Sequence, residues 1–515
     1  MSFLYNWFAG KSQETTEVTT WNGAASYSTL DDPLIQFFFK TVRNITMEDY
    51  KSVEKNRTVP DALAKLLNEA WQVDNLYTMR LIFHLRDCRG GKGEKRLFRL
   101  CCLWLLQNHP EALELNMNQI PEFGSIKDFF NIFLGTVYEN NMLERVADQL
   151  KKDLGNLKNN EGVSLAAKYA PTENHAFDKK FHTVSKLCKL LNVTKVQYRK
   201  EYLVPLRSKL NIVEHYLCNN EWDKVCYSNV PSIANVMYRN AFIKHDGERY
   251  RQHCKDVTND EAKINTGVLS SYQIVEQYMT LHHTGFGIKI KEYDETIEAQ
   301  WNSFITRVKE NWSGVNILPI VDLSGSMFSN KVAHIAIALG LVASNLNSSP
   351  EYNGKWITFS HAPVIETLNG NTLHSQLESM SKSHIGLSTS LSSTFELLLN
   401  NAKSQSLAKE QMPQVLLILS DMQFNSIDNS ASSTNWDHIN SLYANEGYTR
   451  PTIIFWNLHG STIDFPVPSA NIKNCILLSG FNDSLFNAIS NGECPNPRKI
   501  VDEIINSERY SKIKV

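Results

Sequence analysis

The 515-residue sequence has no long hydrophobic run and no cysteine pair of the metal-binding kind. Its apolar segments, such as Val415–Leu419, have strand length and fall far short of the roughly 18 apolar residues of a membrane helix. Nine cysteines include no CxxC pair, which argues against a disulfide framework or a zinc ribbon. The N-terminal segment lacks a cationic start and a small-residue cleavage site, so it is a poor signal peptide. We therefore expect a cytoplasmic protein that has reduced thiols and no membrane partner.

The sequence also has no large excess of positive or negative side chains. Lys and Arg number 52 against 54 Asp and Glu, a net charge of −2, so the whole chain does not attract nucleic acid. Two segments nevertheless are basic. Residues 80–99, the first basic island, carry seven basic and two acidic side chains, and residues 151–209, the second, carry thirteen and five. Such islands fit either a surface for an anionic ligand or solvated helix faces.

The pattern of apolar residues divides the chain into four parts. Residues 1–32 are rich in Ser, Thr, Asn and Gly and predict a flexible N-terminal arm. Residues 33–305 show helical periodicity and predict an all-α domain, an irregular array of helical repeats. Residues 312–492 predict an α/β domain, and residues 493–515 a C-terminal helix or tail.

Strand-length apolar runs alternate with helical segments after residue 312. The runs are Val315–Val321, Lys355–Ser360, Val415–Ser420, Thr452–Trp456 and Cys475–Leu478. Because most of them are almost wholly apolar, they predict a doubly wound, mostly parallel sheet that helices cover on both faces. The predicted fold class is therefore multidomain, α plus α/β.

Oxygen-bearing side chains follow two of these strands. Asp322, Ser324 and Ser326 form a D-x-S-x-S loop directly after the first strand, and Asp421 follows VLLILS. Ligands bind outside the carboxyl ends of strands in such sheets, and a small hard cation such as Mg²⁺ prefers oxygen ligands. Between these segments, Thr389 precedes a helix and can present its hydroxyl to the same edge. The sequence therefore predicts a metal site there.

This order of loops resembles a von Willebrand factor A domain with a metal-ion-dependent adhesion site. Asp322, Ser324 and Ser326 match its first loop, Thr389 its middle loop, and Asp421 its aspartate after the fourth strand. The resemblance implies one Mg²⁺ or Mn²⁺ and a partner that offers an acidic group, a protein ligand. It leaves open an A-type fold that has lost its metal.

Motifs upstream carry a second resemblance. Leu81–Glu94 (LIFHLRDCRGGKGE), Pro121–Asp128 (PEFGSIKD) and Ala241–Tyr250 (AFIKHDGERY) resemble domain of unknown function family 2828, which occurs in giant viruses, bacteria, fungi and plants. In a viral member the expected location is the host cytoplasm or the virion. The domain order is similar to that of the Ro ribonucleoprotein autoantigen, in which a ring of HEAT-like repeats (the TROVE module) precedes an A domain. This similarity implies binding of structured or misfolded RNA.

The first basic island supplies candidate RNA-binding side chains around Gly90–Gly93. They are Arg86, Arg89, Lys92, Lys95, Arg96 and Arg99. Glycines let backbone N–H groups approach a phosphate while cationic side chains neutralise it. The alternative is a joint between two helices, with glycine at the C-cap and basic residues near the helix end.

Catalytic motifs are missing from the sequence. It has no G-x-S-x-G elbow and no zinc-type spacing of histidines. We therefore expect no enzyme but a binding scaffold, in which a TROVE-like region binds RNA and an A domain binds a ligand through the metal. A protein–protein adaptor that has the metal site and binds no RNA is the alternative.

Overall fold

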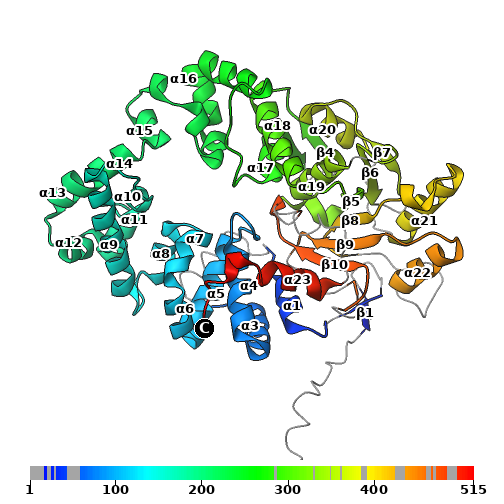
Figure 1. The fold of residues 1–515 in the computed structure, drawn as a ribbon, viewed down its shortest axis with the longest axis horizontal. Coiled ribbons are helices and arrows are strands. Elements are labelled where there is room, and N and C mark those ends of the chain that lie inside the picture. Colours follow the sequence, from blue (N-terminus) through cyan, green and yellow to red (C-terminus); the bar gives the residue numbers. More distant parts are fainter. Residues whose placement is uncertain are drawn as a thin grey trace, which may run out of the picture.

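The computed structural model describes most of the chain. The described residues are 17–19, 25–27, 30–42, 58–282, 287–328, 331–347, 349–359, 362–383, 391–423, 435–459, 466–467, 471–483, 486 and 496–515. Helices form an arc that begins beside the last strand of a sheet and returns to that sheet's first helix, so the chain closes into a ring (Figure 1). This confirms the predicted class of α plus α/β.

The first half of the arc consists of short helices. They are α1 (Pro33–Lys40), α3 (Asp61–Val73), α4 (Asn75–Arg86), α5 (Lys95–Asn108), α6 (Pro110–Leu115), α7 (Ile120–Phe123) and α8 (Ile126–Phe133). Local signals fix their starts: the Asp74 side chain accepts from Tyr77 N at the start of α4, and Ser125 and Asp128 form a capping box on α8. In the predicted arm, β1 (Glu17–Thr19) and β2 (Ala25–Tyr27) pair antiparallel.

The second half of the arc leads back to the sheet. It comprises α9 (Glu139–Lys158), α10 (Ala166–Tyr169), α11 (Ala176–Phe181), α12 (Thr183–Leu191), α13 (Lys195–Gln197), the π-helical η2 (Tyr198–Leu203), α14 (Val204–Lys209), α15 (Val213–Cys218), α16 (Ser232–Thr258), α17 (Ser271–Tyr278) and α18 (Glu295–Glu310). The hairpin β3 (Met279–His282) and β4 (Gly287–Ile290) joins α17 to α18. None of the described helices combines the length and apolar character that a bilayer crossing requires.

The sheet of the α/β part has six strands in the order β10-β9-β8-β5-β6-β7. The strands are β5 (Ile317–Asp322), β6 (Lys355–Phe359), β7 (Ile365–Thr367), β8 (Val415–Ser420), β9 (Thr452–Asn457) and β10 (Cys475–Ser479). All neighbours pair parallel except β6 and β7, so β7 is an antiparallel edge strand. The inner strands are buried along almost their whole length, as expected of parallel strands covered on both faces.

Helices connect the strands of this sheet. They are α19 (Val332–Leu346), α20 (Leu373–Lys382), α21 (Leu391–Ser404) and α22 (Asn435–Asn445). Helix α19 is apolar and almost wholly buried, and it packs on β5, β6 and β8. A Cβ atom at Gly340 would lie 2.6 Å from Val321 Cγ2, so glycine permits the close approach of α19 to β5.

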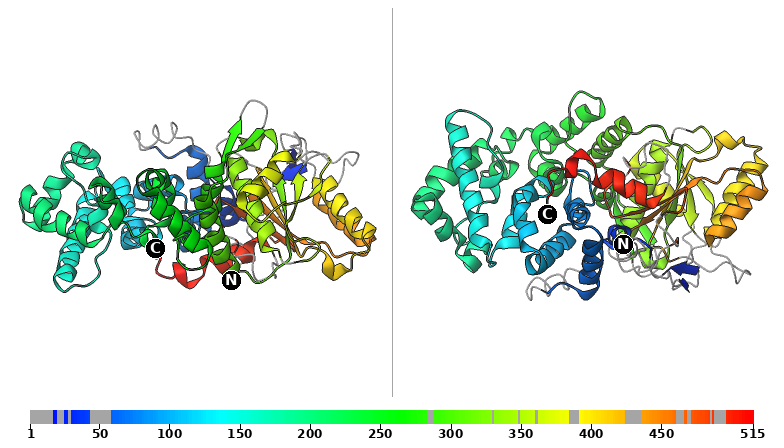
Figure 2. Two further views of the ribbon diagram at one scale, coloured as in Figure 1. Left: turned by 90° about the horizontal axis from the view of Figure 1, so that it is seen from above. Right: turned by 60° about the horizontal axis from the view of Figure 1, so that its bottom comes forward.

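Both ends of the described chain contribute to the junction between arc and sheet. The C-terminal helix α23 (Pro497–Ile505) packs on α1, α4 and β10 (Figure 2). Tyr77 of α4 donates a 2.9 Å hydrogen bond to Asp502 of α23, and Asn116 bonds both the N–H and the carbonyl of Lys514. The segment 496–515 therefore fastens the α/β part to the start of the arc.

Candidate functional site

Two carboxylates mark the carboxyl edge of the sheet. Strand β5 ends at Asp322, and Asp421 directly follows β8, its parallel neighbour. The connection from β5 runs to β6 on one side, and the later strands β8, β9 and β10 add on the other side. The strand order thus changes direction between β5 and β8. Ligands of doubly wound sheets bind at this switch point.

Hydroxyl groups surround Asp322. Its Oδ1 accepts from Ser324 N at 2.9 Å, and its Oδ2 accepts from Ser420 Oγ at 2.6 Å. The hydroxyl oxygens of Ser324 and Ser326 lie 3.2 Å apart, as expected if alternate side chains of the loop share one direction. Asp421 Oδ1 accepts from Gln423 N at 3.2 Å. The structure thus brings together four of the five predicted metal ligands.

The edge is electrostatically unfavourable for the carboxylates alone. Asp322 is fully buried, and burial, followed by the nearby charge of Asp421, raises the pKa of Asp322 to about 7. Among the described residues, no Lys, Arg or His forms an ion pair with Asp322. The buried carboxylate of Asp322, with a second carboxylate and two hydroxyls beside it, fits a hard divalent cation that prefers oxygen ligands.

The fifth predicted ligand cannot be placed. Thr389 lies in segment 384–390, outside the described residues. The described parts of the chain contain no group of three or more His, Cys, Asp and Glu side chains that could hold a metal. The candidate site therefore differs from carboxylate-rich centres because its donors include hydroxyls.

The first basic island is largely internal. Arg86 is buried and donates two hydrogen bonds, 3.0 and 2.9 Å, to Asp128 Oδ2, while Arg99 binds Oδ1 of the same carboxylate. Burial alone would raise the pKa of Asp128, but the two guanidinium groups outweigh it and lower that pKa. A Cβ at Gly124 would lie 2.6 Å from Asp128 Oδ2. The motif PEFGSIKD therefore supplies the carboxylate of this buried ion pair, Asp128, and the glycine that leaves room for it, Gly124.

Lys92 is also buried. Its Nζ atom contacts the carbonyl of Phe38, the carbonyl of Thr41 at 3.1 Å and Ser479 Oγ at 2.7 Å. Burial lowers the pKa of Lys92 to about 7. A Cβ at Gly91 would lie 2.1 Å from the carbonyl oxygen of His84. The glycines thus serve the packing of a helix joint, the alternative that the sequence left open.

These positions correct the prediction for Arg86 and Lys92, two of the six candidate RNA-binding side chains of the first island, which are buried. Arg99 is 19% exposed and forms an ion pair with Asp128. Arg96 is half-buried, and only Arg89 and Lys95 are exposed. Periodicity could not reveal this, because the acidic partner Asp128 lies more than 25 residues from each arginine along the chain.

The second basic island is mostly on the surface. Ten of its basic side chains are exposed: Lys151, Lys152, Lys158, Lys179, Lys180, Lys189, Lys195, Arg199, Lys200 and Lys209. Only three acidic side chains of the island are exposed: Glu161, Glu173 and Glu201. Asp153 and Asp178 are instead buried and accept hydrogen bonds from Ser164 and from the backbone of Val184. Burial of these two carboxylates makes the surface of α9 to α14 more basic than the sequence count suggests.

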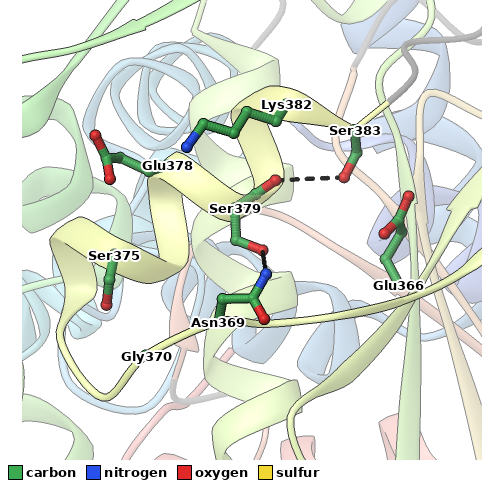
Figure 3. A pocket seen from close by; sticks show the side chains of 8 residues that line it. All are labelled: Glu366, Asn369, Gly370, Ser375, Glu378, Ser379, Lys382 and Ser383. Carbon is green, nitrogen blue, oxygen red and sulfur yellow. Dashed lines mark hydrogen bonds between the residues drawn. The ribbon is translucent and has the colours of Figure 1, made fainter.

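A hollow of about 360 Å³ lies beside β7 and α20 (Figure 3). Glu366 and Glu378 lie on different sides of it, and Asn369 donates a 3.3 Å hydrogen bond to Ser379 Oγ. Neither His nor Cys is among its eight lining residues.

The fold and the site together define a two-part protein, a helical arc closed by a doubly wound α/β unit with an oxygen-lined edge. A family model for a domain of unknown function, DUF2828, matches residues 20–146 and 140–313, and the chain belongs to this family. A model for a second domain of unknown function, DUF7788, matches residues 316–510. A protein of Acanthamoeba polyphaga mimivirus, described as uncharacterized, is 29% identical over 521 residues, which is 94% of this chain and 86% of the relative.

Proposed function

We propose that this protein is a non-enzymatic binding scaffold whose α/β part is of von Willebrand factor A type. Asp322, Ser324, Ser326, Thr389 and Asp421 would hold one Mg²⁺ or Mn²⁺ at the carboxyl edge of the sheet. When bound, the cation would supply a positive charge that captures an acidic group of a protein ligand. The chain's own residues orient the donors: Ser324 N and Ser420 Oγ donate to the two carboxylate oxygens of Asp322.

The topology of the sheet supports this proposal. Numbered along the chain within the sheet, its strands lie in the order 3-2-1-4-5-6, with strand 3 antiparallel at the edge. This order places the end of strand 1 beside the end of strand 4, where Asp322 and Asp421 lie.

The observation that carries the proposal is that Asp322 is buried next to Asp421 and, among the described residues, forms no ion pair with a basic side chain. A buried carboxylate is costly unless it is paired, protonated or bound to a metal. The neighbouring donors are hydroxyls rather than further carboxylates. A site for phosphoryl chemistry usually places several carboxylates on its metal ions, so this donor set favours capture over catalysis.

Calorimetric titration with MgCl₂ and MnCl₂ tests the metal site. We expect one cation per chain for the wild type and no measurable binding for Asp322→Ala. Glu410→Ala is the matched control, because Glu410 is an exposed carboxylate of the same α/β part. Equal binding by the wild type and Asp322→Ala would refute the assignment.

RNA binding by the second basic island is a further proposed function. It rests on the ten exposed basic side chains against three exposed acidic ones in residues 151–209, because such an excess attracts the phosphate backbone. This surface is preferred to the first island, in which Arg86, Arg99 and Lys92 are bound to partners inside the protein.

A gel-shift comparison of two multiple variants tests this placement. Replacing Lys179, Lys180, Arg199 and Lys200 by Gln should weaken binding of every RNA sequence about equally, because phosphate contacts carry no base information. The matched control replaces Lys95 and Arg96 of the first island by Gln and should leave affinity nearly unchanged. If the wild type binds no RNA at low salt, the protein is the adaptor of the alternative interpretation.

A further inference from the structure

A small cavity lies where the two ends of the arc meet the sheet. Four segments line it: Cys88–Arg89 after α4, Gly267–Leu269 before α17, Arg307–Asn311 at the end of α18, and Asn482–Asp483 after β10. Its volume is about 80 Å³, which is room for a few water molecules. It is well below the roughly 300 Å³ at which pockets for drug-sized ligands begin.

Arg307 has unused donors in this cavity. Its Nε atom is buried and has no hydrogen-bond partner, and its one hydrogen bond, from NH1 to the Gly267 carbonyl, is long at 3.4 Å. Among the described residues no carboxylate lies within ion-pair distance of this guanidinium. A buried N–H without a partner is costly and calls for a ligand or an ordered water.

A second guanidinium lines the same cavity. Arg89 is exposed, and the structure gives its side chain one hydrogen bond, 2.8 Å from NH1 to the carbonyl of Glu122. Because an arginine has five N–H donors in a planar fork, most of the donors of Arg89 remain for a ligand. The two arginines come from α18 and from the joint after α4, segments more than 200 residues apart.

The acidic residue of the lining is already bound elsewhere. Asp483 accepts hydrogen bonds from the N–H of Ser271, at 2.8 Å, and from the Ser271 hydroxyl, one at each carboxylate oxygen. These bonds direct its carboxylate to the start of α17. The charge of Asp483 still acts on Arg307, so two guanidinium groups stand against one carboxylate in the lining, and its net positive charge favours an anion.

We propose that this cavity binds a single phosphate group, held by Arg307 and Arg89. A tetrahedral oxyanion matches the size, and guanidinium groups bind phosphate oxygens through paired N–H donors. The phosphate is either free inorganic phosphate or the terminal monoester of a larger molecule that stays outside. The site does not depend on the proposed metal centre or on the second basic island.

Titration of the full-length protein with inorganic phosphate tests the site. It is done in EDTA at constant ionic strength, so that failure of the metal centre has no influence. We expect saturable binding that Arg307→Gln weakens about tenfold or more, since a hydrogen bond to a charged group contributes at least that factor. Arg251→Gln, an exposed arginine on α16, is the matched control and should bind like the wild type.

Arg89→Gln is a second variant, because its exposed side chain can change without a packing defect. Weaker binding by it supports the site even if Arg307→Gln does not fold. Absence of phosphate binding by the folded wild type, or equal affinity of the wild type and both variants, would overturn the proposal.

Oligonucleotides separate the two sources of phosphate. If a 5′-phosphorylated oligonucleotide displaces bound inorganic phosphate and its 5′-hydroxyl counterpart does not, the site is supported and its ligand is a terminal monoester. If phosphate binds and neither oligonucleotide displaces it, the site is supported and its ligand is the free ion.

Discussion

Lys92 Nζ lies 2.7 Å from Ser479 Oγ, a contact between residues 387 positions apart that joins the loop after α4 to the end of β10. The same hydroxyl donates to the Phe38 carbonyl of α1 at 2.8 Å. Gly480 has a φ of +109° and would, with a Cβ, contact the Lys92 side chain. One lysine thus holds three segments together where the ring closes.

Replacing Lys92 by Met should destabilise this junction. The substitution keeps the length of the side chain but leaves the Thr41 carbonyl without its charged donor, which costs about 1–3 kcal/mol in free energy of unfolding. Urea denaturation measures the change. Lys95→Met, an exposed neighbour, should stay within about 0.5 kcal/mol of the wild type. An unchanged midpoint for Lys92→Met would show that the contact is not stabilising.

The C-terminal segment makes a second buried connection. Tyr510 donates to Asp87 Oδ2 at 3.0 Å, and its hydroxyl lies 2.9 Å from Nδ1 of His84. Arg509 also binds both oxygens of Asp87, and the ring of Tyr510 stacks on Phe123.

Tyr510→Phe tests the hydrogen bonds of this connection without altering the stacking. It should lower the free energy of unfolding by about 1–3 kcal/mol, because Asp87 and His84 stay buried and lose a partner. It should also speed proteolytic release of the C-terminal segment, followed by mass spectrometry. Tyr293→Phe is the control, since Tyr293 is 56% exposed. Equal cleavage of Tyr510→Phe and the wild type would contradict this role.

His84 should make stability depend on pH. Burial, assisted by the positive charge of Lys92, lowers the pKa of His84 to about 3. Below its ordinary pKa of about 6.5 the unfolded chain therefore binds a proton that the folded chain does not. The contribution of His84 to stability should fall as pH drops from about 6.5 towards 3, by up to about 1.4 kcal/mol per pH unit. Asp87 acts in the same direction, since hydrogen bonds from Arg509 outweigh burial and lower its pKa. Asp322 and Asp483, whose pKa values burial raises, contribute in the opposite direction.

Unfolding in urea at pH 7, 6, 5 and 4 measures this slope. His84→Phe removes the titrating group, so between pH 6 and pH 4 its stability should rise relative to that of the wild type. The same substitution at exposed His175 should leave the slope as it is. A wild-type slope in His84→Phe would assign the effect to other groups.

Much of the fold was predictable because it depends on local patterns. Apolar runs such as Val415–Ser420 marked the buried strands, and the spacing of Asp322, Ser324 and Ser326 marked the strand end where the hydroxyls gather. The roles of Arg86 and Lys92 were not predictable. Their partners Asp128 and Ser479 are distant in the sequence, and a charge count does not distinguish a buried ion pair from a surface.

The second basic island should give RNA binding a steep dependence on salt. Each neutralised phosphate of a single strand lowers the slope of log K against log salt by about 0.7. The variant with Gln at Lys179, Lys180, Arg199 and Lys200 should therefore have a shallower slope than the wild type, by up to about 3 if each side chain neutralises one phosphate. Filter binding between 50 and 300 mM KCl measures both slopes, and identical slopes would place the RNA elsewhere.

Removal of the metal should separate the two proposed functions. The candidate metal ligands lie at the carboxyl edge of the sheet, whereas the second basic island lies on α9 to α14, on the side of the ring opposite the sheet (Figure 1). Exposed charges separated by more than roughly 10 Å are largely screened at 0.1 M salt. Loss of the divalent cation should therefore leave the affinity of the second basic island for RNA unchanged. EDTA should thus abolish capture of a protein with an acidic ligand group in a pull-down, while a gel shift with RNA stays unchanged. Asp322→Ala in Mg²⁺ should reproduce the EDTA result, and Glu410→Ala should not. If RNA binding disappears together with the metal while circular dichroism shows a folded protein, the two sites are coupled through the ring and do not act independently.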